Sequence, residues 1–93
     1  MTFTWLNKQG VRSSEGFDVQ CTSRFTIEYR EGRRIKVIEV ERVVIGGKPG
    51  VGIKASTFER WDNSSVPNSP TEQARLLRNF RAAMEFQGME VEV

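Results

Sequence analysis

The chain has 93 residues, of which 38% are apolar and 28% charged, and its formal net charge is +2. A chain of this length forms one small domain, and this composition is ordinary for a globular protein. The sequence contains no histidine and a single cysteine, Cys21. These counts exclude Ser-His and Cys-His catalytic pairs, histidine metal sites and disulfides within the chain. We therefore expect one domain over residues 1–93 that is not an enzyme and holds no cofactor or metal.

The N-terminal segment does not resemble a targeting signal. Residues 1–6 lack the basic lead and the apolar stretch of a secretory signal. No segment approaches the roughly 20 apolar residues that span a bilayer. A single unpaired cysteine agrees with a reducing compartment. We expect a cytoplasmic protein that makes no membrane contact.

The first half of the chain predicts antiparallel strands. Valine and isoleucine together outnumber leucine fifteen to three, which favours strands. Residues 17–22 and 25–30 alternate apolar and polar side chains, as half-buried strands do. The turn at 30–33 leads into a further alternating segment from Ile35, so we predict a hairpin. The apolar phase shifts by one residue after Val37, which indicates a bulge or a strand break.

A second hairpin is predicted around the glycine-rich stretch. Residues 43–45 form a short strand that ends at Gly46–Gly47. We expect residues 48–50 to turn the chain into a strand at 51–53. The glycine-rich stretch lacks the spacing of a phosphate-binding loop and precedes a strand instead of a helix. It is interpreted as a hairpin connection and not as a nucleotide site.

Helical signals occur only in the second half. Ser56 and Glu59 have the spacing of a capping box, which predicts a short helix through Trp61. The stretch Ser69–Glu72 is a stronger start, with a cap residue, proline at the first helical position and glutamate at the third. Apolar residues then recur with helical period for about eighteen residues, until Gly88 closes the helix.

The order of these elements predicts an α+β fold. Met89, Val91 and Val93 alternate with glutamates and indicate a final strand. We expect an antiparallel meander of five to six strands, a short helix, one long C-terminal helix on one sheet face and a C-terminal strand. The long helix, about 10 Å wide, is narrower than the sheet, which is roughly 25 by 17 Å. Sheet curvature, the segment with Trp61 or a second chain must cover the rest, so a homodimer is one interpretation.

Two arginine clusters are candidate contact surfaces. Arg30, Arg33 and Arg34 lie at the tip of the predicted hairpin, and Arg75 and Arg78 lie beside the apolar face of the long helix. The planar guanidinium suits pairing with carboxylates or phosphates. The clusters are compatible with an acidic protein partner or a nucleic-acid backbone. A solvated surface without a partner explains them as well.

The aromatic residues of the strands are interpreted as core residues. Such residues can stack on nucleic-acid bases, but Trp5, Phe25 and Tyr29 are each in phase with an apolar side. Cys21 shares the side of Phe17 and is interpreted as a buried small hydrophobe.

One ordered set of motifs goes beyond fold class. Tyr29-Arg30-Glu31-Gly32-Arg33 is followed by Gly46-Gly47, by Phe58 with Trp61-Asp62, and by Asn79, Ala83 and Phe86 ahead of Gly88 and a closing strand. In this order and spacing, the motifs resemble a bacterial family of immunity proteins from polymorphic toxin systems, number seventy-four in that classification. The resemblance runs from about Phe17 to Val93.

The resemblance implies a non-enzymatic protein that binds a cognate toxin and neutralises it by occlusion. It carries over a structural signature of Gly46, Gly47, Trp61, Asp62, Asn79 and Gly88. In this interpretation Trp61 packs under the long helix, while Asp62 and Asn79 hydrogen-bond the loop that joins the two helices. The residues leave two alternatives open: a nucleic-acid-binding module that uses the arginine clusters, and a homodimer of unassigned function.

Overall fold

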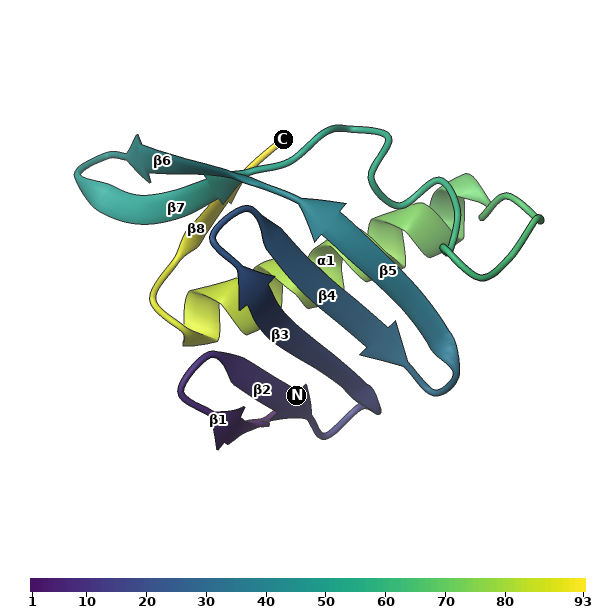
Figure 1. Ribbon diagram of the computed structural model, residues 1–93, viewed down its shortest axis with the longest axis horizontal. Coiled ribbons are helices and arrows are strands. Elements are labelled where there is room, and N and C mark those ends of the chain that lie inside the picture. The colour runs from purple at the N-terminus through teal and green to yellow at the C-terminus, as the bar shows by residue number, and fades with distance from the viewer.

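Alternating apolar and polar residues place much of the first half of the chain in β-strands, and the computed structural model describes all residues from 1 to 93 (Figure 1). The strands are β1 (Phe3–Asn7), β2 (Gly10–Ser13), β3 (Phe17–Ser23), β4 (Thr26–Glu31), β5 (Arg34–Glu39), β6 (Glu41–Ile45), β7 (Lys48–Gly52) and β8 (Glu90–Glu92). The single helix, α1, spans Pro70–Phe86. The predicted α+β class is confirmed.

The strands form two sheets. The predicted antiparallel meander is confirmed for β1 to β5, which are neighbours in chain order. The strands β6, β7 and β8 form a second, three-stranded sheet, in which β8 runs parallel to β7. Figure 1 shows α1 crossing behind the five-stranded sheet, while the β6–β7 hairpin projects beyond one end of it. The predicted C-terminal strand is therefore present, and its partner is β7.

The predicted break after Val37 lies at Val40, between β5 and β6. No bulge interrupts the pairing of β5 with β4. Lys36 lies opposite the buried Tyr29 and therefore faces the core side of the sheet. Its amine reaches Asp62 at 3.2 Å, which satisfies the charge at the sheet edge. The apparent phase shift thus has a simple cause, since Val37 faces outward and is 42% exposed.

The second hairpin turns at Gly46 and Gly47. Both residues have positive φ, at 57° and 81°. A two-residue turn with two positive φ angles matches the twist of the flanking strands, and glycine adopts it without strain. The predicted turn at residues 48–50 is wrong, because these residues already belong to β7. Pro49 fits there because the pairing of β7 with β8 begins only at Gly50.

The long helix begins and ends as predicted. The Ser69 hydroxyl accepts a hydrogen bond from the Glu72 amide at 3.1 Å, and Pro70 occupies the first helical position. At the other end Gly88 has φ +82°, and the Met89 amide donates to the Met84 carbonyl at 2.9 Å. This pattern satisfies carbonyls that the last helical turn leaves free.

The predicted short helix at 56–61 is wrong. The segment forms turns instead, with the Glu59 amide donating to the Ser56 carbonyl at 3.1 Å. The Asp62 amide donates to the Ile35 carbonyl of β5 at 2.8 Å. This bond draws the chain alongside the sheet edge, so the turns do not continue as a helix. The capping-box spacing was therefore not sufficient without enough helical residues after it.

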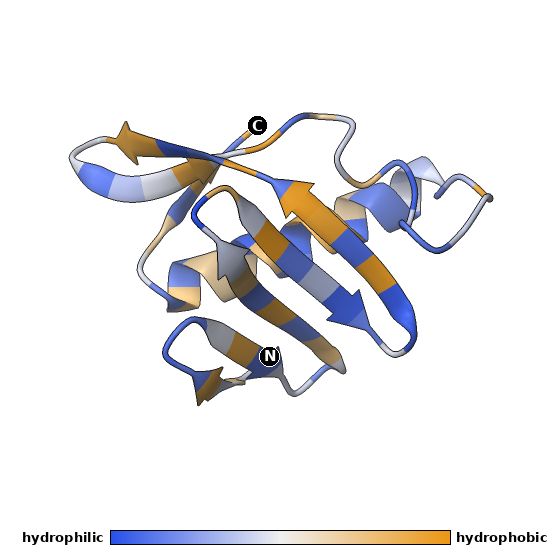
Figure 2. Ribbon diagram, in the orientation of Figure 1, coloured by the Kyte–Doolittle hydropathy of each residue, from blue (hydrophilic) through white to orange (hydrophobic).

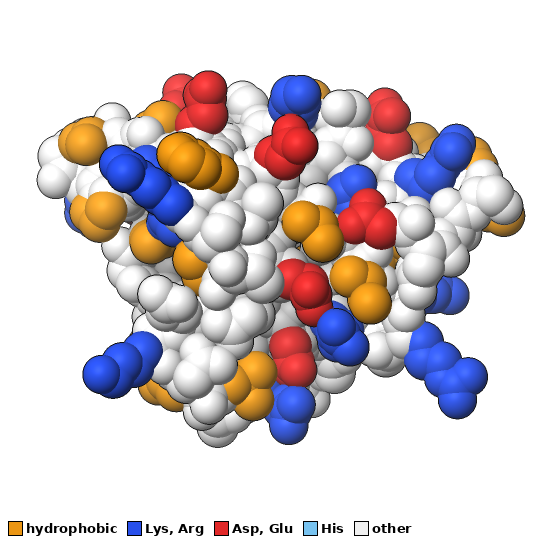
Figure 3. Space-filling view, viewed as in Figure 1, with side chains coloured by type: hydrophobic (Ala, Val, Ile, Leu, Met, Phe, Trp, Pro, Cys, Tyr) orange, Lys and Arg blue, Asp and Glu red, His pale blue; other side chains and the backbone are white.

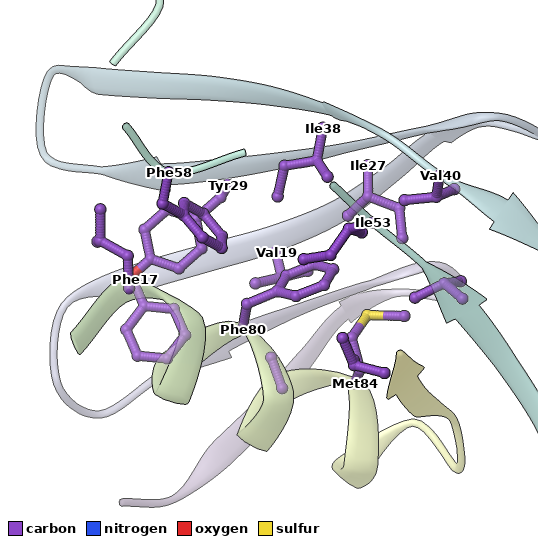
Figure 4. Packing of buried hydrophobic residues seen from close by; sticks show 14 of the residues in the cluster. Phe17, Val19, Ile27, Tyr29, Ile38, Val40, Ile53, Phe58, Phe80 and Met84 are labelled. Carbon is purple, nitrogen blue, oxygen red and sulfur yellow. The ribbon is translucent and has the colours of Figure 1, made fainter. Parts of the chain in front are cut away.

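The core lies between the five-stranded sheet and α1. It contains 16 buried apolar residues. Figure 2 shows the alternation of apolar and polar residues along β3, β4 and β5, which gives the sheet one apolar face. Figure 4 shows Phe80 and Met84 of α1 directed toward this face. Phe58 and Trp61 are buried and cover part of the remaining apolar surface, so a loop does what the short helix was expected to do.

The aromatic predictions divide. Tyr29 is fully buried, as expected, but Trp5 and Phe25 are 53% and 61% exposed, so their assignment to the core is wrong. Trp5 belongs to the edge strand β1 and packs against Phe86 at 5.5 Å between ring centroids. Phe25 lies in the turn between β3 and β4, where period-two alternation no longer determines direction. Cys21 is half-buried instead of buried.

Candidate functional site

The three arginines predicted at the hairpin tip do lie around the β4–β5 turn. Arg30 is ion-paired within its own strand, because its guanidinium donates to Glu28 at 2.8 and 3.1 Å. Arg33 and Arg34 are exposed and form no ion pair. The Arg34 guanidinium lies 6.0 Å from the centre of the Trp61 ring. Of the three arginines, only Arg33 therefore has a side chain that forms neither an ion pair nor a contact with an aromatic ring.

The helix arginines differ from each other. Arg75 donates two hydrogen bonds to the Glu31 carboxylate, at 2.7 and 3.1 Å, and also pairs with Glu72. These contacts raise the pKa of Arg75 and, through the hydrogen bond from Arg75, lower the pKa of Glu72. Arg78 is exposed and forms no ion pair. The structure thus joins Arg75 to the hairpin through Glu31 and leaves Arg78 free.

A buried polar network continues from Glu31 into the core. The Tyr29 hydroxyl donates to Glu31 at 3.0 Å and accepts a hydrogen bond from the Asn79 side chain at 3.1 Å. Burial is the main cause that raises the pKa of Tyr29. Its ring packs against Trp61, with 5.8 Å between the centroids. The network fixes α1 to β4, so we assign it a structural role.

The signature residues Asp62 and Asn79 do not act as the resemblance suggested. Asn79 bonds to Tyr29 and not to a loop. Asp62 follows the free edge of β5, where it accepts from the Val37 amide at 2.6 Å. Asn63 adds two bonds to the same edge, to the Ile35 amide and the Arg33 carbonyl. Asp62 and Asn63 thus occupy backbone groups of β5 that a sixth strand would bind, and they protect this edge from pairing with another chain.

A groove lies where the two sheets meet, with a volume of about 730 Å³. Its apolar lining is Phe25, Val40, Val43, Ile53 and Val93, its acidic lining is Glu39, Glu41 and Glu92, and its remaining residues are Thr26, Gly52 and Lys54. The break at Val40 creates this groove, because it lets β6 leave the plane of the five-stranded sheet. The site thus combines apolar surface with a net negative charge.

The glutamates of the groove are free of partners in the chain. Glu39, Glu41 and Glu92 are exposed, and none of them takes part in an ion pair. This distinguishes them from Glu31 and Glu72, which bind Arg75. Unpaired carboxylates beside apolar surface attract a ligand that is both cationic and apolar.

Sequence reasoning missed this site. The alternation of apolar and polar residues predicts only that Glu39, Glu41 and Glu92 lie on the polar sides of their strands. Nothing in the local pattern shows that Glu92 and Glu41 flank the same residue, Gly52, on the two sides of β7. The available signal was the predicted strand break, which the structure places at Val40, where one sheet ends and the other begins.

No three acidic or cysteine side chains of the chain gather in a way that could hold a metal ion. The helix α1 is neither long enough nor apolar enough to cross a membrane.

Comparison with protein-family models, with curated proteins and with solved structures found no match. Membership of the immunity protein family therefore stays a prediction.

The homodimer through the uncovered part of the sheet also stays a prediction. The apolar side chains exposed at the β1 edge are Trp5, Leu6 and Phe86, with 53%, 41% and 43% of their surface accessible. Analytical ultracentrifugation of the chain at micromolar concentration tests whether it forms this homodimer.

Proposed function

We propose that this chain is a non-enzymatic protein-binding module that neutralises a cognate bacterial toxin by occupying its surface. The family resemblance suggests the toxin as the partner. The groove between the two sheets supports protein binding, and it is the observation that carries this proposal. Its unpaired glutamates favour a basic segment of the partner, while Phe25 and Val43 offer apolar contact.

The groove suits an extended segment better than a small molecule. It is lined by both sheets, and its acidic residues lie on three different strands. Residues from several elements then contact one bound segment at once. The charges at the rim act mainly on the association rate and on the choice of partner, while the apolar floor contributes the larger share of affinity.

The test uses a toxin domain encoded next to the gene of this chain. The chain and that domain are co-expressed, and both complex formation and survival of the cells are measured. We expect a stable complex and protection from the toxin. A triple variant of the groove, with Glu39→Gln, Glu41→Gln and Glu92→Gln, should weaken the complex and reduce protection.

The matched control changes three glutamates outside the groove. Glu59→Gln, Glu85→Gln and Glu90→Gln remove the same charge from residues that do not line the groove and form no ion pair. This variant should bind and protect as the original chain does. Equal loss in both variants would contradict the groove as the binding site, and absence of any complex would contradict the immunity function.

Nucleic-acid binding is the weaker alternative. Two of the five candidate arginines, Arg30 and Arg75, are ion-paired within the chain. Figure 3 shows Lys and Arg scattered around one face of the molecule among acidic and apolar side chains, without a continuous basic patch. Phosphate binding requires such a patch and weakens steeply with salt. Binding of oligonucleotides at low salt that is lost at high salt would favour this alternative over the groove.

A further inference from the structure

A row of three residues crosses the three-stranded sheet at the groove. Glu41 of β6 lies opposite Gly52 of β7, and Gly52 lies opposite Glu92 of β8. Directly opposed residues of neighbouring strands point to the same face of a sheet. Strands are about 4.8 Å apart, so the Cα atoms of the two glutamates flank the glycine at a separation of roughly 10 Å. The two carboxylates therefore border a site that has no side chain in its middle.

This gap above Gly52, here called the notch, is not required by the packing of the sheet. A Cβ atom at Gly52 would lie 3.8 Å from Val43 Cγ1 and 3.9 Å from Glu41 Cβ, which are ordinary contacts. Gly50, two residues earlier on the same strand, differs, because a Cβ there would lie 2.9 Å from the Glu90 carbonyl oxygen. Gly52 also lacks a positive φ. Neither crowding nor backbone strain explains the glycine at position 52, and its notch opens into the groove.

We propose that the notch binds an arginine side chain of the partner protein, with the guanidinium lying on the Gly52 backbone between the carboxylates of Glu41 and Glu92. This inference rests on the proposed protein-binding function. The guanidinium is planar and carries donors on several edges, so one group can donate to carboxylates on both sides. A lysine ammonium is compact and more strongly hydrated, so it pairs well with one of the two carboxylates at a time.

The chain's own cations leave the notch free. Arg24 lies over the Phe25 ring, with its guanidinium carbon 5.7 Å from the centroid, but it does not line the groove. Lys54 lines the groove and forms no ion pair with the glutamates. The apolar residues Val43 and Val93 offer a surface for the aliphatic stem of the incoming arginine.

The test is an NMR titration of the full chain with three capped pentapeptides. In each, one central residue is flanked by leucines, and that residue is arginine, lysine or citrulline, the uncharged analogue of arginine. We expect the amide signals of Glu41, Gly52 and Glu92 to shift in a saturable way with the arginine peptide. Binding of the citrulline peptide should be roughly tenfold weaker or more, because hydrogen bonds to charged groups are the stronger ones. The lysine peptide should lie between them.

Variants of the chain connect this binding to the notch. Gly52→Ala places a methyl group in the notch at ordinary contact distances, so it should fold and bind the arginine peptide several-fold more weakly. The double variant Glu41→Gln and Glu92→Gln should lose the preference for arginine over citrulline. Glu90→Gln, on β8 but outside the groove lining, should bind as the original chain does.

The outcomes separate the two proposals. Equal binding of the arginine and citrulline peptides in the groove would overturn the arginine site while supporting a protein-binding groove. Equal binding of the lysine peptide would also overturn the choice of arginine. Failure of every peptide to shift any groove signal would count against the groove itself. If the Gly52→Ala variant binds the arginine peptide as tightly as the original chain does, the arginine side chain does not bind in the notch.

Discussion

Two regions of this molecule both contain several glutamates but differ in what surrounds these side chains. In the Tyr29 network, Glu31 and Glu72 hold Arg75 between β4 and α1, and the hydrogen bonds end inside the core. In the groove, Glu39 and Glu41 have no partner in the chain. The first region uses its charges to join two elements, while the second leaves them available to another molecule.

This difference shows why charge counts alone are a poor guide to a binding surface. The clustering of the arginines in the sequence predicts that they form contact surfaces. Arg30 and Arg75 are nevertheless neutralised by neighbouring glutamates. Fewer charges line the groove, but they lie beside apolar surface and lack partners, and that combination favours binding.

The largest expected effect is on the free energy of unfolding, and it differs between two aromatic residues of the β3–β4 hairpin, Tyr29 and Phe25. Tyr29→Ala should lower the free energy of unfolding by about 3–5 kcal/mol, because the ring is fully buried and packs on Phe17, Phe58 and Trp61. Phe25→Ala should change it by less than about 0.5 kcal/mol, since the ring is 61% exposed. Urea unfolding followed by tryptophan fluorescence measures both.

If Tyr29→Ala does not fold at all, Tyr29→Phe keeps the comparison measurable. It retains the ring and removes only the hydroxyl, so it should cost about 1–2 kcal/mol through the unpaired groups left at Glu31 and Asn79. A Phe25→Ala variant as unstable as Tyr29→Phe would show that the groove is part of the core.

The ion pair between Glu31 and Arg75 should contribute less than the ring. We expect Arg75→Ala to lower the free energy of unfolding by about 1–2 kcal/mol, because the pair is bidentate but partly exposed. The double variant with Glu31→Ala should be more stable than the sum of the two single changes predicts. Strict additivity in this cycle would mean that the two side chains do not interact. Glu41→Ala, in the groove, should leave stability nearly unchanged.

Asn79→Ala tests the signature residue in its observed position. The change removes the donor to the Tyr29 hydroxyl and should lower the free energy of unfolding by about 1 kcal/mol. The fall should largely disappear when the change is made in the Tyr29→Phe background, because the hydroxyl is then absent. An equal fall in both backgrounds would assign Asn79 to packing instead. Thermal unfolding of the four chains measures this.

The smallest expected effect is the loss, at alkaline pH, of the stability that the Tyr29 hydroxyl contributes. Burial raises the pKa of Tyr29, so the folded state favours the neutral phenol. The resulting stability is fully present below about pH 10, the ordinary value for tyrosine, and is lost as the pH rises from there toward the raised value. Tyr29 is the only tyrosine of the chain. The difference in unfolding midpoint between the original chain and Tyr29→Phe should therefore shrink as the pH increases above 10, and tyrosinate absorbance should appear only on unfolding.

The sequence predicted the long helix well and the short one badly. Between Ser69 and Gly88 a cap, a proline, helical periodicity and a terminating glycine all favour the same element, and each acts locally. Between Ser56 and Trp61 only the cap spacing favoured a helix, and a backbone bond from Asp62 to the edge of β5 overrode it. Agreement among several local signals distinguishes the two cases.

The sequence by itself determined the fold class, the meander of β1 to β5, the end of β6 before Gly46–Gly47 and both ends of α1, because periodicity, caps and glycine conformations act over a few residues. Only the tertiary structure decided that Val40 separates two sheets and that β8 returns beside β7. It also decided which charges are paired. The groove therefore could not be predicted from the sequence, since Glu41 and Glu92 come together only through pairing of strands that are distant in the chain.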